Sequence, residues 1–393
     1  MKVFLRGLNA CIQRKADIKR YRQYLAENGH ELVGSPEEAE TILLWTCSYR
    51  RDQHDNSLRL VDEYGKLPGE LVVCGCLPSI DPAGLRHCFK GRAFEWKNQY
   101  DWMPALFGTS APDLAGFERG FMERSIPKDL ATYKQENPHQ KVTYSDQFLK
   151  MYPSEGCKQT CAYCAERMAF PAYRSIPVQS LVDRSRALME ETGQRRLVLW
   201  ADSLGDYGHD MGESLPGLVR ALLAIDPAVE IGLENMHPVH ALGHLPFLLE
   251  LLDEGRLFLL KVPIQSASGR VLSLMRRNYD RADIERLFGA VMGTGFKNFE
   301  TDVIAGFPTE TGDEFLETLD FVTGHRVKYV LLSGYLETPG MDSAAIFPKV
   351  PQEEIARRLE LARERLGLAG IFYNDDNSSS AKERFEKDFV DFG

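Results

Sequence analysis

Several features that place a protein in a broad class are missing from these 393 residues. No run is long and apolar enough to span a bilayer, so we expect no membrane partner. Residues 1–6 lack the longer apolar stretch and cleavage site of a signal peptide, which favours a cytoplasmic protein. An excess of positive charge is also missing, because 47 Lys and Arg against 57 Asp and Glu leave a net charge of −10. Affinity that depends on phosphate contacts usually needs a basic surface, so the charge disfavours nucleic acid as a partner.

Cysteine is scarce, and disulfides are not expected in a large chain without a secretion signal. Metal binding is therefore the leading explanation where cysteines cluster. Cys157, Cys161 and Cys164 form a Cys-x3-Cys-x2-Cys motif with no fourth cysteine nearby. Three thiolates can hold three irons of a [4Fe–4S] cluster and leave the fourth iron open to a ligand. The alternative is a structural zinc site with a distant fourth ligand, for which His209 is the nearest downstream histidine.

Residues 1–95 are predicted to form a small α/β domain with a parallel sheet. Its predicted strands are 3–5, 41–45 and 70–73, and its predicted helix runs from about 18 to 28. Cys11, Cys47 and Cys76 each come after one of these strands. Because the carboxyl ends of parallel strands meet at one edge, the three cysteines are expected to converge there. From the residues alone, three ordinary buried thiols are the simpler explanation.

Residues 96–146, with prolines scattered among charges, are predicted to be a connector. A repeated strand-then-helix pattern over residues 147–350 predicts a partial (β/α)6 barrel, with chemistry at the carboxyl ends of its strands. Its predicted strands are 148–152, 197–200, 230–233, 257–262, 298–304 and 328–332, and its predicted helices are 178–191, 214–225, 243–253, 281–293 and 312–323. Residues 351–393 are predicted to be a C-terminal helix and tail.

The cysteine motif, with Tyr163 before its last cysteine, is similar to the signature of radical S-adenosylmethionine (SAM) enzymes. Residues 261–277 and 301–311 resemble segments typical of methylthiotransferases, a family within that class. Short matches to the same family's N-terminal domain lie at 36–40, 46–47 and 75–77. The resemblance covers about residues 1–95 and 147–366, and the fold class that it implies is the small α/β domain followed by a radical SAM barrel.

This resemblance implies SAM and two [4Fe–4S] clusters as cofactors. The cluster on Cys157, Cys161 and Cys164 would bind SAM and cleave it to a 5′-deoxyadenosyl radical, after reduction by a flavodoxin- or ferredoxin-type donor. The auxiliary cluster, on Cys11, Cys47 and Cys76, would handle sulfur. The residues matched to the SAM site, or placed beside it at strand ends, are Tyr163, Asp202, Glu234, Gln265 and Arg277.

The sequence also departs from the family pattern. The usual C-terminal β-barrel that helps bind substrate is not found, and Trp45, Asp202 and Lys261 stand where the family more often has asparagine, glutamine and histidine. Together with the acidic charge, these departures favour a peptide or protein substrate, such as a ribosomally made natural-product peptide. Its binding site would be lined by Trp45, Tyr49 and Lys261. There are three alternatives. In the first, the substrate is tRNA, which is the less favoured partner. In the second, the second cluster is used only for electron transfer or substrate binding, and in the third the protein is a non-catalytic iron–sulfur sensor.

Overall fold

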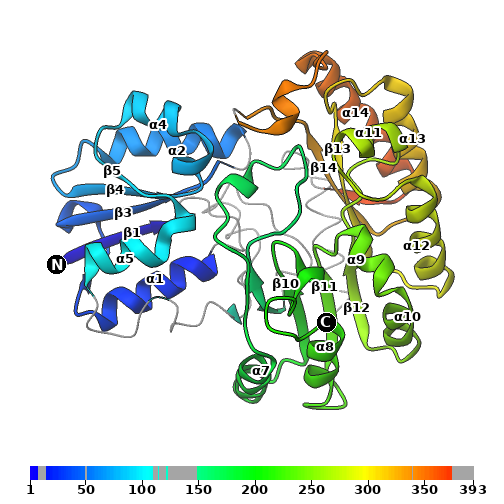
Figure 1. Ribbon diagram of the computed structural model, residues 1–393, viewed down its shortest axis with the longest axis horizontal. Helices are drawn as coiled ribbons and strands as arrows, with labels where there is room; N and C mark the ends of the chain where they lie inside the picture. The colour runs from blue at the N-terminus through cyan, green and yellow to red at the C-terminus, as the bar shows by residue number, and fades with distance from the viewer. Residues whose placement is uncertain are drawn as a thin grey trace. The chain divides into compact units, whose positions relative to one another are not determined.

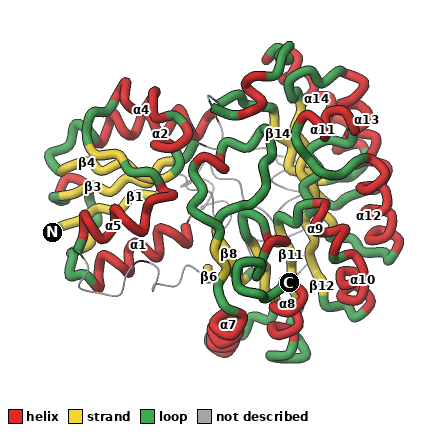
Figure 2. Tube along the Cα trace, in the orientation of Figure 1, coloured by secondary structure: helices red, strands yellow, loops and turns green. Residues whose placement is uncertain are grey.

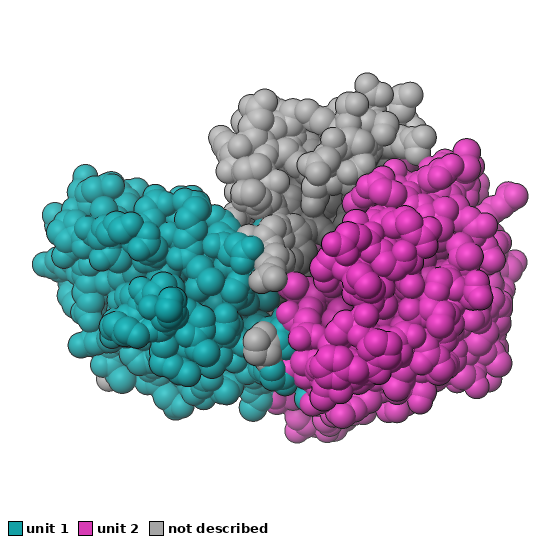
Figure 3. All heavy atoms as spheres, turned by 90° about the horizontal axis from the view of Figure 1, so that it is seen from above, with its two compact units in different colours: residues 1–142, 165–172, 338–340 teal, residues 143–164, 173–337, 341–393 magenta. Residues whose placement is uncertain are grey.

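The computed structural model describes residues 1–7, 15–48, 51–108, 114, 121–122, 148–338 and 340–373. The chain divides into two compact units (Figure 3). Unit 1 comprises residues 1–142, 165–172 and 338–340, and unit 2 comprises residues 143–164, 173–337 and 341–393. The eight residues after Cys164 thus belong to the N-terminal unit, although the residues before and after them belong to the other unit.

Unit 1 is built on a parallel sheet in the order β2-β1-β3-β4-β5. Its strands are β1 (Lys2–Gly7), β2 (Glu31–Leu32), β3 (Thr41–Thr46), β4 (Glu70–Gly75) and β5 (Arg92–Ala93). Its helices are α1 (Lys15–Glu27), α2 (Arg51–Tyr64), α3 (Leu77–Ile80), α4 (Pro82–Cys88) and α5 (Gln99–Phe107). α1 and α5 cover one face of the sheet, and α2 and α4 cover the other (Figure 1).

Both faces of this sheet are buried, which is why its strands are nearly continuous apolar runs. Along β3, Leu43 and Trp45 pack into the cluster under α1 and α5, whereas Ile42 and Leu44 pack into the cluster under α2. α5 falls in the stretch that the sequence predicted to be a connector, and its Phe107 belongs to the first cluster. The core of unit 1 therefore extends beyond the predicted domain boundary at residue 95.

Unit 2 contains a parallel sheet in the order β15-β14-β13-β12-β11-β10-β7. Its strands are β7 (Leu149–Met151), β10 (Arg196–Trp200), β11 (Glu230–Glu234), β12 (Leu257–Lys261), β13 (Phe299–Ala305), β14 (Tyr329–Gly334) and β15 (Phe372–Tyr373). A small antiparallel pair in unit 2 is formed by β8 (Ser154–Glu155) and β9 (Arg174–Ser175). β6 (Phe121–Met122) falls within the residues of unit 1.

The helices of unit 2 lie on the outer side of the curved sheet (Figure 2). They are α7 (Val178–Thr192), α8 (Leu215–Leu223), α9 (Pro238–Gly243), α10 (Leu245–Asp253), α11 (Gly269–Leu274), α12 (Arg281–Gly293), α13 (Gly312–Gly324) and α14 (Gln352–Leu368). The predicted fold class, a small parallel α/β domain followed by a partial barrel, is confirmed. Among the described helices, none combines the length and the apolar character needed to cross a bilayer.

Candidate metal centre

The loop that carries Cys157, Cys161 and Cys164 follows β8 and is fixed by hydrogen bonds at both ends. At its start, Gly156 has a φ of +81°, and its N–H donates to Asp202 Oδ2 at 2.9 Å. Farther along, Ala162 N–H donates to the Met275 carbonyl, and Ser343 N–H donates to the Ala162 carbonyl, each at 3.0 Å. The loop is thus held in one conformation by three separate segments of unit 2.

Two sulfur atoms of the motif accept hydrogen bonds. The Gln159 backbone N–H donates to Cys157 Sγ, and Arg277 Nη1 donates to Cys161 Sγ, each at 3.4 Å. Donors directed at sulfur suit thiolates that bind iron, because they stabilise negative charge on the ligand. Burial raises the pKa of the Cys157 thiol to about 12, so iron binding at this position must release a proton.

No three His, Cys, Asp or Glu side chains in the described ranges come together closely enough for a single metal ion. An iron–sulfur cube has a different requirement, because each thiolate binds its own iron. The donor set on this loop, three thiols of which two already accept hydrogen bonds at sulfur, fits the cube.

The side chain between the first two cysteines is held by a polar network that the sequence analysis missed. Gln159 Nε2 lies 3.3 Å from Asp206 Oδ2 and 3.1 Å from His240 Nε2. His240 Nε2 is 3.4 Å from Asp206 Oδ1, and Ser203 Oγ donates to Asp206 Oδ2 at 2.6 Å. Although burial opposes it, hydrogen bonds from His240 and Ser203 lower the pKa of Asp206 to about 2. A firmly ionised carboxylate therefore anchors Gln159.

Arg277, predicted to contact SAM, lies directly beside the cysteine loop. Besides Cys161, its guanidinium donates to the Tyr163 and Tyr279 hydroxyls at 3.1 and 3.0 Å and to the Pro263 carbonyl at 2.5 Å. Only 7% of Arg277 is exposed. The structure thereby brings together two predicted site residues, Tyr163 and Arg277, with a candidate cluster ligand.

One more predicted residue, Gln265, and a histidine, His237, shape the backbone around this site. Gln265 has a φ of +66°, and its backbone pairs with β13 through hydrogen bonds to Asp302 and Ile304. His237 caps α9, because its Nδ1 accepts from Val239 N–H at 3.3 Å. Burial, reinforced by the Arg277 charge, lowers the pKa of His237 to about 2, so this ring stays neutral.

A layer of charged side chains is buried inside the barrel. Lys150 Nζ lies 3.2 Å from Glu234 Oε2, and Lys261 Nζ lies 3.0 Å from Asp302 Oδ1. Glu300 pairs in strand register with Lys261, and burial raises the pKa of its carboxyl to about 8. Its Oε2 is buried and has no hydrogen-bond partner among the described residues. Glu234 and Lys261, predicted to contact SAM or substrate, thus form ion pairs with strand residues.

In unit 1, Cys47 directly follows β3 and Cys76 directly follows β4. These strands are neighbours, with Thr46 opposite Gly75. The Cys47 N–H donates to Ser57 Oγ at 3.0 Å, and the Cys76 N–H donates to the Thr46 carbonyl at the same distance. In the order 2-1-3-4-5, this carboxyl edge is where such sheets bind ligands. The structure therefore places two of the three predicted auxiliary ligands at one edge.

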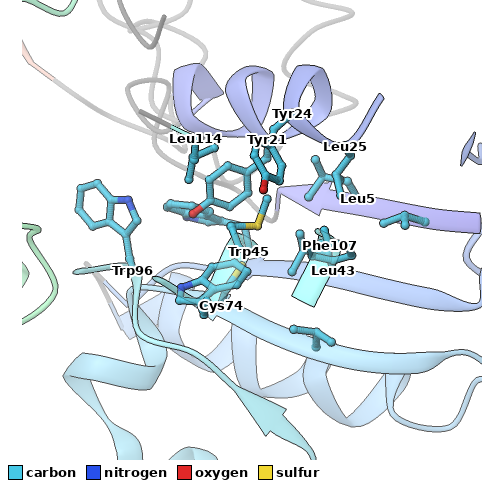
Figure 4. Packing of buried hydrophobic residues seen from close by; sticks show 14 of the residues in the cluster. Leu5, Tyr21, Tyr24, Leu25, Leu43, Trp45, Cys74, Trp96, Phe107 and Leu114 are labelled. Carbon is cyan, nitrogen blue, oxygen red and sulfur yellow. The ribbon is translucent and has the colours of Figure 1, made fainter. Parts of the chain in front are cut away.

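Two other predicted residues of this unit, Cys11 and Tyr49, lie outside the described residues. Trp45 is described, and it has no exposed surface. Its ring packs edge to face against Tyr21 and Trp96, at centroid distances of 5.4 and 5.8 Å (Figure 4). This position in the core does not support a role for Trp45 in lining a substrate site.

Known families match both units. A model of the radical SAM superfamily matches residues 151–322, which include the three-cysteine loop and Arg277. A model described as an uncharacterized protein family, UPF0004, matches residues 7–93, which include Cys11, Cys47 and Cys76.

Relatives of known name also match along most of the chain. The threonylcarbamoyladenosine tRNA methylthiotransferases of Xenopus laevis and Drosophila melanogaster are each 28% identical, over 90% and 95% of this chain. A probable enzyme of the same name from Pyrococcus horikoshii is 25% identical over 88% of this chain. The chain spans 63%, 66% and 79% of the length of these three relatives.

Solved structures support the fold. The radical SAM methyltransferase TsrM from Kitasatospora setae matches 87% of this chain and 76% of its own, with a TM-score of 0.58 and 13% identity. The cobalamin-dependent SAM radical enzyme OxsB matches 92% of this chain and 56% of its own, with a TM-score of 0.52 and 12% identity. At these identities the likeness concerns the fold alone.

Proposed function

Because this chain belongs to the radical SAM methylthiotransferase family, we propose that it replaces a C–H hydrogen of a tRNA nucleoside by a methylthio group. The observation that carries the proposal is the match to relatives named for this reaction, which extends along most of the chain. The two family models include both cysteine sets. Threonylcarbamoyladenosine is the nucleoside in the names of those relatives, and it is the substrate that we propose here.

Cys157, Cys161 and Cys164 would hold the cluster that binds SAM, and a one-electron donor of the flavodoxin or ferredoxin type would reduce it. When bound, such a cluster with an open iron supplies the reductive cleavage of SAM. The protein's own part is to hold the loop through Asp202, Met275 and Ser343 and to direct donors at its sulfur atoms. Tyr163 and Gln265 are proposed to contact SAM.

Cys11, Cys47 and Cys76 are proposed to hold the auxiliary cluster and to handle sulfur. The placement of Cys47 and Cys76 after neighbouring strands supports this role. Two further cysteines, Cys74 and Cys88, belong to neither proposed cluster. Cys74 is fully buried within β4, and Cys88 is exposed at the end of α4. Cys88 therefore offers a matched control for cysteine substitutions.

The peptide substrate predicted from composition is replaced by tRNA in this proposal. That prediction depended on departures from the family pattern and on a net charge of −10 for the whole chain. The net charge does not describe the charge around one site. The names of the relatives are specific to tRNA, and nothing of comparable specificity favours a peptide.

The proposal is tested by anaerobic reconstitution with iron and sulfide, followed by reaction with reductant, SAM and tRNA that carries threonylcarbamoyladenosine. We expect two [4Fe–4S] clusters per chain and a nucleoside whose mass rises by the replacement of one hydrogen by a methylthio group. Replacing Cys157, Cys161 and Cys164 together by alanine should leave one cluster and abolish SAM cleavage, whereas Cys88→Ala should leave both unchanged.

Three results would contradict the proposal in different ways. A single cluster in the unmodified chain would reject the two-cluster assignment. A methylthio group on peptides, with tRNA untouched, would restore the substrate that the composition favoured. SAM cleavage with no methylthio product on either substrate would favour the third possibility, in which the auxiliary cluster serves electron transfer or substrate binding.

A further inference from the structure

We propose that Arg277 raises the reduction potential of the SAM-binding cluster by directing a fixed positive charge at the sulfur of Cys161, and that this is its role instead of binding the SAM carboxylate. This inference deepens the proposed function and rests on its assignment of the cluster to Cys157, Cys161 and Cys164. It assigns to Arg277 a role different from the one that the sequence predicted.

Every nitrogen of the Arg277 guanidinium already donates to the protein. Nε donates to the Tyr279 hydroxyl at 3.0 Å, and Nη2 donates to the Pro263 carbonyl at 2.5 Å. Nη1 donates both to Cys161 Sγ at 3.4 Å and to the Tyr163 hydroxyl at 3.1 Å. A bidentate grip on a carboxylate needs two parallel N–H groups on one edge of the guanidinium. Those groups are occupied by protein acceptors here.

The orientation of the guanidinium is fixed by its neighbours. The Tyr279 hydroxyl, which accepts from Nε, itself donates to the Ile264 carbonyl at 2.6 Å. The guanidinium carbon of Arg277 also lies 5.2 Å from the centre of the Tyr279 ring, within the range of a cation–π interaction. The carbonyl of Met275, two residues before Arg277, accepts from the N–H of Ala162, which follows Cys161, so this hydrogen bond connects the segment of the arginine to the cysteine loop.

The Arg277 charge has no carboxylate partner in the described part of the chain. Its oxygen partners are two phenol hydroxyls and one carbonyl, all uncharged, and it forms no ion pair with a described Asp or Glu. A buried cation without an anion is costly, and a guanidinium does not lose its proton to avoid that cost. The remaining partner, Cys161, becomes part of an anionic centre when its thiolate binds a cluster.

This arrangement has a definite consequence for the cluster. Reduction adds negative charge, and a buried cation stabilises the reduced state more than the oxidised state because Coulomb energies are large at low dielectric. Hydrogen bonds to cluster sulfurs act in the same direction. Arg277 should therefore make the cluster easier to reduce, before SAM binds and independently of it.

The test is a redox titration of the cluster without SAM. We would use the full chain with Cys11, Cys47 and Cys76 replaced by alanine, so that one reconstituted cluster remains, and follow the reduced state by electron paramagnetic resonance. The Arg277→Gln variant should have a more negative midpoint potential. The matched control is Arg276→Gln, since Arg276 carries the same charge but is 53% exposed and pairs with Asp342. We expect no shift in that control.

Two further variants keep the test decisive. Arg277→Lys retains the charge and should recover part of the lost potential. Tyr279→Phe keeps the ring but removes the hydroxyl that orients Nε, so it should shift the potential in the same direction by less, and it serves if Arg277→Gln fails to fold. An unchanged midpoint potential in Arg277→Gln, together with a tenfold or greater rise in the SAM dissociation constant, would overturn the inference and assign Arg277 to the carboxylate.

The outcome is separable from that of the proposed function. If the background chain takes up no cluster at all, the cysteine assignment itself is rejected, and the inference falls with it. If the cluster forms and the potential shifts as expected, the inference stands even where no methylthio product is found, because the titration contains neither SAM nor substrate.

Discussion

Gly75 separates the buried Cys74 from Cys76 and has a φ of +94°. An added Cβ would lie 2.3 Å from the Thr46 carbonyl oxygen and 2.8 Å from the Thr46 nitrogen, both atoms of the neighbouring strand. The chain can turn from β4 to Cys76 at this point only because the residue has no side chain. The edge that carries Cys47 and Cys76 therefore depends on one glycine.

We expect Gly75→Ala to destabilise unit 1 strongly. Gly29 is the matched control, since its φ is +78° but an added Cβ would meet nothing within 4 Å. Gly29→Ala should cost only the left-handed backbone term, about 1–2 kcal/mol, whereas Gly75→Ala must also move β3 or β4. Urea unfolding of the two variants measures the difference, and equal losses would show that the close approach is unimportant.

At the scale of single residues, the sequence predicted which residue types form the site better than it predicted the contacts of their side chains. The cysteine loop was predictable because three closely spaced cysteines with no fourth nearby favour an iron–sulfur cluster with an open iron, and a family resemblance then suggested its chemistry. The hydrogen bond from Arg277 to Cys161 was not, because it joins residues 116 positions apart. The burial of Trp45, which was predicted to line a substrate site, was not predictable either, because a residue at a strand end lies at an edge but its side chain can still point into a core. Gln159 lay inside the motif, yet nothing in the sequence showed its contacts with Asp206 and His240.

Among the elements, the strands of the barrel carry the least expected feature. The charged layer lies on β7, β11, β12 and β13, at positions where a barrel of this size would hold apolar side chains. Lys150 and Lys261 are each paired with a carboxylate, and Glu300 is the remaining acid. Burial keeps Glu300 protonated near neutral pH, which brings the layer close to electrical balance.

This arrangement predicts a pH-dependent stability. The pKa of Glu300 is about 8 when folded and 4.5 in its ordinary state, so the folded protein binds the extra proton between these values. Stability should therefore fall as pH rises through this window, by about 1.4 kcal/mol per pH unit from this group. Glu300→Gln should remove this pH dependence. In urea unfolding, the free energy of unfolding of the variant, relative to that of the unmodified chain, should therefore rise between pH 6 and pH 7.5.

The control for this prediction is Glu250→Gln, an exposed carboxylate on α10 that pairs with Arg220. Its effect on stability should be small at both pH values, as is usual for surface ion pairs. A pH profile for Glu300→Gln that runs parallel to that of the unmodified chain would show that Glu300 is ionised in the folded state.

Element positions in the barrel followed from periodicity where the elements were long. The helix predicted over 281–293 has those bounds, and a capping box of Thr311 and Glu314 opens α13, a helix predicted over 312–323. α9 and α11, with six residues each, were missed, because fewer than two turns give no detectable period. α2 was missed because its first half, from Arg51 to Asn56, is entirely polar.

For the molecule as a whole, the path of the chain differs from the simple order of domains that the sequence predicted. Residues 165–172 contain the turn η6 (Glu166–Met168) and belong to unit 1. Ala169 is fully buried in the cluster under α1 and α5, where Met168 and Phe170 also pack. Phe170 lies edge to face with Trp96, at a centroid distance of 6.0 Å. The composition of residues 165–172 did not indicate that they pack into the core of unit 1.

We therefore expect Ala169→Asp to loosen unit 1 and not unit 2. A buried, unpaired carboxylate in this cluster should remove several kcal/mol of stability from its surroundings. Amide hydrogen exchange should show faster exchange in β1, β3 and β4, with β10 to β13 unchanged. Ala187→Asp, on the exposed side of α7, is the control and should alter neither unit. Faster exchange confined to the barrel strands would contradict the assignment of this segment.

The same segment constrains how such a protein can be recombined with its relatives. A crossover between two genes at a single point near residue 142 would join the N-terminal region of one parent to residues 165–172 of the other. The aromatic and small side chains of that segment would then meet a core shaped by a different sequence. Functional hybrids should therefore inherit three separated stretches together, residues 1–142, 165–172 and 338–340, so the natural unit of inheritance is a set of three pieces.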